Sequence, residues 1–128
     1  MPIDRRQTSV LIVEDDPDLR ELLRLDFELA GYQATAAPSG KTAISALQTS
    51  AAQVVVSDIR MPDGDGIFLL KEIKTQGIPS LVYLITGYAD VNDHDLIKMG
   101  CLGVFQKPFD IEALMATIDR DLAASQAA

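Results

Sequence analysis

The segment Val54-Val55-Val56-Ser57-Asp58 decides the fold of this chain. A run of valines that ends in an acid, followed by a turn-forming stretch over residues 59–66, is typical of a strand buried on both faces. Such strands belong to parallel sheets, which carry their functional groups at the carboxyl ends of the strands. Asp58 therefore stands where an open α/β sheet places its chemistry.

A second acidic strand end lies earlier in the chain. Glu14 and Asp15 directly follow the apolar run over residues 10–13. If the two strands are neighbours in one parallel sheet, these acids converge with Asp58 at the same edge. Three converging carboxylates predict a site for a hard cation, with a carboxylate that could also act as a nucleophile.

Strand and helix signals alternate five times along the chain. The predicted strands cover residues 10–13, 33–37, 54–58, 81–86 and 104–106. The predicted helices start near Pro17, Ser39, Ile67, Val91 and Ile111, and the leucines of the first helix are expected in the core. This alternation predicts an α/β fold with a five-stranded parallel sheet, order 2-1-3-4-5, and helices on both faces, a flavodoxin-like, doubly wound arrangement.

Composition limits the class of protein. The 128 residues suit one domain, and we expect a flexible segment at 1–8, a folded domain at 9–122 and a tail or linker start at 123–128. A net charge of −8 argues against direct nucleic-acid binding, and no apolar stretch is long enough to span a membrane. The single Cys101 excludes an internal disulfide. These features favour a cytoplasmic protein.

Four motifs, in this order and at this spacing, resemble the receiver domain of two-component response regulators. They cover most of the chain: Leu11-Ile12-Val13-Glu14-Asp15-Asp16, Ser57-Asp58-Ile59-Arg60-Met61-Pro62 with Asp65-Gly66, Ile85-Thr86-Gly87, and Lys107-Pro108-Phe109. The resemblance implies a phosphorylation-controlled signalling switch that catalyses only its own phosphorylation and dephosphorylation. A sensor histidine kinase or phosphotransfer protein would donate the phosphoryl group.

The resemblance also implies a role for each matching residue. Asp58 corresponds to the phosphoacceptor, Thr86 to the hydroxyl that turns towards the phosphoryl group, and Lys107 to the lysine that pairs with it, usually before a cis proline. The implied ligands of Mg²⁺, for which Mn²⁺ can substitute, are Glu14, Asp15, Asp58 and the backbone carbonyl of Arg60.

Three positions bear on how the switch works. Receivers often carry an aromatic residue three positions before the lysine, whereas this chain has Val104 there and Phe105 next to it. Arg60 and Tyr88 match the two positions that border the path of the hydrolytic water. Their bulk predicts slow loss of the phosphoryl group.

The sequence leaves the output of the switch open. The motif around Asp58 is similar to that of receivers that precede transcription activators, and both a stand-alone receiver and the domain of a longer regulator fit it. The resemblance is equally compatible with a monomer and with a phosphorylation-dependent dimer.

Two other functions place an acid or a phosphate at the same strand ends, and the sequence argues against both. An aspartate-nucleophile phosphatase of the haloacid-dehalogenase type needs a second Asp where this chain has Arg60. A flavodoxin-like flavin carrier needs a first loop that cradles phosphate, and the acidic loop at Glu14 and Asp15 would repel one. The remaining polar residues are interpreted as structural or exposed: Asp16 as a helix cap, Asp65 as a loop or cap residue, Cys101 as a buried packing residue and His94 as a surface residue.

Overall fold

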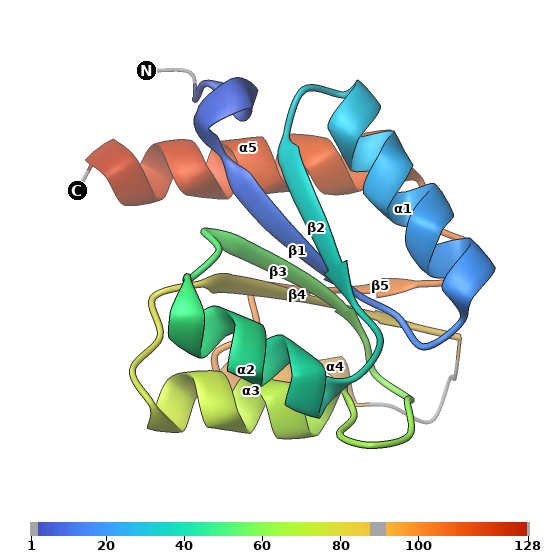
Figure 1. The fold of residues 1–128 in the computed structure, drawn as a ribbon. Helices are drawn as coiled ribbons and strands as arrows, with labels where there is room; N and C mark the ends of the chain where they lie inside the picture. Colours follow the sequence, from blue (N-terminus) through green and yellow to red (C-terminus); the bar gives the residue numbers. More distant parts are fainter. Residues whose placement is uncertain (1–2, 88–91, 128) are drawn as a thin grey trace.

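A parallel sheet forms the centre of the computed structural model, which describes residues 3–87 and 92–127 (Figure 1). Its strands are β1 (Ser9–Val13), β2 (Gln33–Ala37), β3 (Val54–Asp58), β4 (Leu81–Thr86) and β5 (Gly103–Gln106). They pair in the order β2-β1-β3-β4-β5. The predicted fold class and strand order are confirmed, and β1 and β3 are neighbours, so their acidic ends lie side by side.

Helices cover both faces of this sheet. Helices α1 (Pro17–Leu29) and α5 (Ile111–Ala127) lie on one face, and α2 (Gly40–Thr49), α3 (Gly66–Thr75) and α4 (Asp93–Lys98) on the other (Figure 1). Alternation of side chains along each strand divides the core in two. Val10 and Val56 pack towards α1 and α5, whereas Leu11 and Val55 pack towards α2 and α3. None of the helices in the described ranges is long and apolar enough to cross a membrane.

Polar caps begin the helices that follow the functional strand ends. Asp16 accepts hydrogen bonds from the backbone N–H groups of Asp18 and Leu19, and Asp65 accepts one from Phe68. Each cap satisfies donors that have no partner within the first helical turn. The capping role predicted for Asp16 is therefore confirmed, and of the two roles left open for Asp65 the structure shows the cap.

Regular structure extends close to both ends of the described chain. A 3₁₀ helix, η1 (Arg5–Gln7), precedes β1, and α5 continues to Ala127. The Arg5 guanidinium lies 2.6 Å from Asp119 of α5 and also stacks on the ring of Tyr32. The N-terminal residues are thus tied to α5, while the proposed domain limits stay a prediction. The predicted start of the fourth helix, Val91, lies outside the described residues; α4 is capped by Asn92.

The prediction that the leucines of the first helix are core is wrong for Leu22, Leu25 and Leu29. Leu23 is buried, but Leu22, Leu25 and Leu29 are 56%, 40% and 77% exposed. At spacings of three and four residues they form a stripe on the outer side of α1, which we call the α1 leucine row. Helical spacing alone does not reveal which of two leucine stripes faces the sheet.

A close backbone contact fixes the start of α3 against the end of β3. The N–H of Gly66 donates to the carbonyl of Ile59 at 2.8 Å. A Cβ atom at Gly66 would lie 2.5 Å from the Asp58 carbonyl oxygen and 2.9 Å from Ile59 Cα. Both neighbours are backbone atoms, so they cannot move aside as a flexible side chain would. Glycine at this position therefore lets α3 begin directly beside Asp58.

We predict that Gly66→Ala lowers the free energy of unfolding by about 1–3 kcal/mol, as overpacking does elsewhere. Gly87→Ala is the matched control, because its added methyl group would meet no atom of the described residues within 4 Å. Urea denaturation should show a lower midpoint for Gly66→Ala and little change for Gly87→Ala. Equal midpoints for Gly66→Ala and the parent would contradict the close-contact argument.

Candidate phosphorylation and metal site

Asp58 ends β3, and each of its two carboxylate oxygens accepts a hydrogen bond. The backbone N–H of Ile59 donates to Oδ1 at 3.0 Å, and Lys107 Nζ lies 3.1 Å from Oδ2. The side chain is 13% exposed, so it is shielded by its neighbours yet reachable from solvent. A carboxylate with fixed orientation and restricted access suits attack on an incoming electrophile.

The loop after β1 brings the other two acids to this point. Glu14 is buried, and its Oε2 accepts the backbone N–H of Asp16 at 3.1 Å, whereas Asp15 is exposed. Arg20, one turn into α1, donates to the Glu14 carbonyl at 3.0 Å. This arginine was not predicted as part of the site. The one available signal was a cation in the first turns of a helix that follows an acidic loop.

Lys107, directly after β5, joins the two buried strand ends. Its Nζ lies 3.3 Å from Glu14 Oε1 as well as 3.1 Å from Asp58 Oδ2. The bond to Pro108 is cis, as the resemblance implied. Burial opposes the charged form of the lysine, but the two carboxylates outweigh this effect and raise its pKa. One ammonium group thus links the ends of β1, β3 and β5.

The surroundings of Glu14 disfavour the charged form of its carboxyl group. Its pKa is raised, first by burial and then by the hydrogen bond with Asp15 and the charge on Asp58. The Asp16 N–H and the Lys107 ammonium act in the opposite direction. A buried carboxylate with two acidic neighbours and one cation is an arrangement in which a second cation would be stabilising.

The predicted metal ligands come together in space. One oxygen from each of Glu14, Asp15 and Asp58 can be chosen so that all three lie within 4.8 Å of one another. They border an open cavity of about 540 Å³, lined by Glu14, Asp15, Asp16, Leu19, Asp58, Arg60, Gly87 and Lys107. Carboxylate oxygens facing a water-accessible space are the donors that Mg²⁺ prefers, because it keeps several waters when bound. The residues present therefore fit the ion.

Thr86 ends β4 next to this group and is buried. Its carbonyl accepts the N–H of Lys107 at 2.8 Å, so the threonine and the lysine are joined through the backbone. Val104 pairs with Leu84 in the sheet and packs into the same core as Leu84, on the α3 and α4 side. Phe105 packs into the opposite core, so it does not replace the missing aromatic residue on the face of Val104.

Of the remaining predicted residues, Cys101 and His94 do not line the cavity at Asp58, whereas Arg60 does. Cys101 is buried, its thiol hydrogen-bonds the Gly103 carbonyl, and burial raises its pKa, so a packing role agrees with the structure. His94 is exposed on α4. Arg60 is exposed and lines the cavity. Tyr88 lies outside the described residues.

Comparison with known proteins identifies the class to which this arrangement belongs. Residues 10–119 match the model of the response regulator receiver domain. The chain therefore belongs to the response regulator receiver domain family, and it is a phosphorylation-controlled switch. The phosphatase and flavin-carrier alternatives are set aside.

Individual relatives agree with this assignment. Over 117 residues the chain is 38% identical to the C4-dicarboxylate transport transcriptional regulatory protein DctD of Pseudomonas aeruginosa, covering 91% of this chain and 25% of DctD. The signal receiver domain of a putative Luxo repressor protein from Vibrio parahaemolyticus superimposes with a TM-score of 0.86 at 26% identity, over 94% of this chain and 93% of that one. Response regulator protein TrrA from Thermotoga maritima, in complex with Mg²⁺-BeF, superimposes with a TM-score of 0.80 at 25% identity. The match covers 89% of this chain and 98% of TrrA. The chain thus spans about a quarter of the length of curated relatives such as DctD.

We predict that Lys107→Gln, measured in a chelator, lowers the free energy of unfolding by about 1–2 kcal/mol. Breaking a fully buried ion pair costs about 3–5 kcal/mol, and the partial exposure of the lysine reduces this value. Lys41→Gln is the control, because Lys41 forms a well-exposed pair with Asp63 at 3.4 Å. Urea titrations should show a clear loss for Lys107→Gln and almost none for Lys41→Gln. Equal losses would mean that Lys107 does not stabilise the strand ends.

Proposed function

We propose that Asp58 accepts a phosphoryl group and that this modification switches the domain between two states. The observation that carries the proposal is the placement of the Asp58 carboxylate, oriented by the Ile59 N–H and by Lys107 at the mouth of the acidic cavity. A carboxylate oxygen of Asp58 attacks phosphorus as the bond to the donor's leaving group breaks. The product is an acyl phosphate on Asp58.

Lys107 assists this transfer from its present position. Its ammonium lies 3.1 Å from the Asp58 carboxylate, so it offsets negative charge that gathers on the phosphoryl oxygens during transfer. Thr86, joined to Lys107 through a backbone hydrogen bond, would turn its hydroxyl towards the new phosphoryl group. With Val104 on this face of β5 in place of an aromatic ring, we propose that the response reaches α4 through packing of smaller side chains.

Mg²⁺, or Mn²⁺ in its place, would be held by Glu14, Asp15, Asp58 and the Arg60 carbonyl. Asp15 is exposed and Glu14 is buried, and both lie close to Asp58. A metal ion bound there would face solvent on the Asp15 side and protein on the Glu14 side. When bound, the ion supplies positive charge that neutralises phosphoryl oxygens. TrrA, whose structure was solved with Mg²⁺-BeF, supports this choice of ion.

The partner that supplies the phosphoryl group is proposed to be a sensor histidine kinase or a phosphotransfer protein. Such a donor has to cover the surface beside Asp58, where α1 begins at Pro17. The α1 leucine row offers apolar area on this helix for that contact.

We propose that the domain acts in the cytoplasm and modifies only itself. It would pass its state to an output domain or a downstream protein rather than to nucleic acid directly. It would do so as a monomer or as a phosphorylation-dependent dimer.

Incubation with Mg²⁺ and phosphoramidate should add one phosphoryl group to the parent chain, and Asp58→Asn should remove this labelling because an amide is a poor nucleophile. Asp16→Asn is the control, because Asp16 lines the same cavity and asparagine also caps helices well. Intact mass spectrometry measures the result. Labelling of Asp58→Asn at the level of the parent would refute the proposal.

Asp15→Ala should lose metal-dependent phosphorylation while the domain stays folded, because Asp15 is exposed and its removal relieves repulsion around Glu14. Asp18→Ala is the control, since Asp18 is an exposed acid on the first turn of α1, outside the acidic group. Calorimetric titration with Mg²⁺ and thermal unfolding test both parts. Parent-like Mg²⁺ affinity in Asp15→Ala would exclude Asp15 as a ligand.

The phosphorylated state should be long-lived, and replacing Arg60 and Tyr88 together by alanine should shorten it. Arg60 lines the cavity through which water reaches Asp58, and hydrolysis needs a close, aligned water. Each tenfold change in rate corresponds to about 1.4 kcal/mol of barrier. Decay of the phosphorylated form at equal Mg²⁺ concentration is the measurement. Decay in the double variant that is no faster than in the parent would rule out shielding of the water path.

A further inference from the structure

Strand β2 is an edge of the sheet without the usual protection. Within residues 3–87 and 92–127 it pairs with β1 only, in continuous register from Gln33 to Ala37. Its sequence, Gln-Ala-Thr-Ala-Ala, contains neither a charge nor a proline, and the unbroken register leaves no bulge. Native proteins commonly use charges, prolines and bulges to prevent another chain from pairing with an edge strand. The edge at β2 is therefore open to strand addition.

The hydrogen bonds to β1 show which backbone groups face outward. The Gln33 N–H donates to Thr8, and the Ala37 carbonyl accepts from Glu14, so both of these residues bond towards β1. Backbone polar groups alternate in direction along a strand. The N–H and C=O groups of Ala34 and Ala36 consequently point to the open edge, and both residues carry only a methyl group that another backbone can approach.

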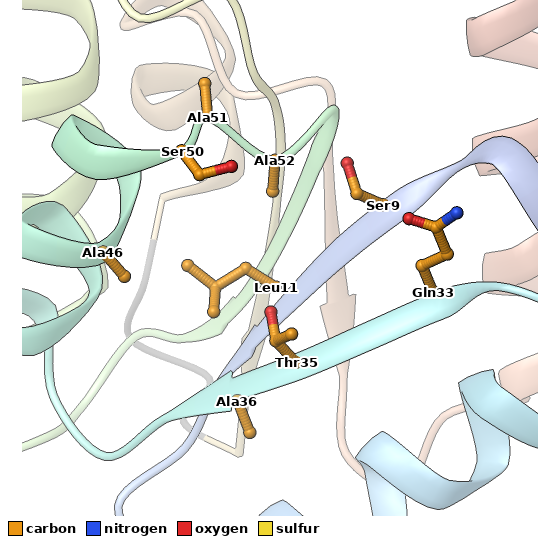
Figure 2. Close-up of a pocket in the computed structure, with 9 residues that line it drawn as sticks. All are labelled: Ser9, Leu11, Gln33, Thr35, Ala36, Ala46, Ser50, Ala51 and Ala52. Carbon is orange, nitrogen blue, oxygen red and sulfur yellow. The ribbon is translucent and has the colours of Figure 1, made fainter.

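A hollow lies beside this edge, between the sheet and α2. It has a volume of about 370 Å³ and is open to solvent. Figure 2 shows Leu11 and Thr35 on the sheet and Ala46 on α2 across from them. Ala46 leaves space that a larger side chain would fill. Because Thr35 and Ala36 of the edge strand also line the hollow, a side chain of an added strand could enter it directly.

We propose that β2 and this hollow bind an extended segment of another protein, which adds a sixth strand to the sheet and places an apolar side chain in the hollow. Strand addition of this kind obtains affinity from backbone hydrogen bonds and specificity from pockets for alternate side chains. The surface lies at β2 and α2 and does not include the phosphorylation site. Binding therefore does not depend on the function proposed for Asp58.

Charge and size favour a basic peptide over a second copy of this chain. Each copy carries a net charge of −8, so two copies repel, whereas a peptide with lysines is attracted. A five-residue strand is about 16 Å long at ~3.3 Å per residue, and one such ladder buries little area for a stable dimer. The occupant is thus an extended peptide in which cationic and apolar residues alternate.

The probes for the test are capped, fluorescein-labelled hexapeptides in which lysine alternates with valine, leucine or phenylalanine. Fluorescence anisotropy with the unphosphorylated 128-residue chain should show saturable binding of at least one of them. The same peptide with alternate backbone nitrogens methylated should lose at least tenfold in affinity, because it keeps its charge but loses edge hydrogen bonds. Failure of all three probes to saturate, or equal binding of the methylated peptide, would overturn the proposal.

Variants of the chain test the two parts of the surface separately. Ala36→Pro removes an outward N–H without touching the bonds to β1, and Ala46→Leu fills the hollow; each should weaken binding at least tenfold. Ser45→Leu, at an exposed position of α2 outside the hollow, should bind like the parent. Urea midpoints confirm folding of each variant. Parent-like affinity in both test variants, or sedimentation showing self-association that Ala36→Pro abolishes, would refute a peptide partner.

Discussion

The ammonium of Lys107 between the carboxylates of Glu14 and Asp58 is the interaction on which the functional end of this molecule depends. Parallel strands bring their carboxyl ends to one edge, and here two of those ends carry buried or half-buried acids. Without a cation the two charges would repel across the sheet. One lysine from a third strand end offsets them and leaves the outer side of the cluster open. In the function proposed for Asp58, the same group would serve both the stability of the fold and the chemistry of the site.

The strands, and the acids at their ends, could be predicted because their signals are local in the sequence. Valine-rich runs followed by acids indicate buried parallel strands, and the placement of Asp58 follows from the end of its own strand. The neighbouring positions of Glu14 and Lys107 needed a strand order, which the resemblance to a known family provided. What could not be predicted depends on tertiary contacts: the bond from Arg20 to the Glu14 carbonyl, and the attachment of Arg5 to Asp119.

Few residues connect the candidate site with the surface at α4. Thr86 is buried, and its carbonyl holds the backbone of Lys107, so movement at either residue is transmitted to the other. Beyond them, Val104 packs towards α3 and α4, whereas Phe105 faces α5. A valine side chain is smaller than an aromatic ring, so a change in its position displaces fewer neighbouring atoms. In the proposed switch, the surface at α4 would therefore respond to small shifts of the strand end more than to rotation of one large side chain.

The α1 leucine row has a consequence for how this domain behaves in concentrated solution. Leu22, Leu25 and Leu29 expose apolar surface that would favour association, while a net charge of −8 keeps copies apart. The range of that repulsion is set by ionic strength, from about 10 Å in 0.1 M salt to about 3 Å in 1 M salt. Colloidal stability of the domain thus rests on its charge, and salt weakens that protection while leaving the leucines unchanged.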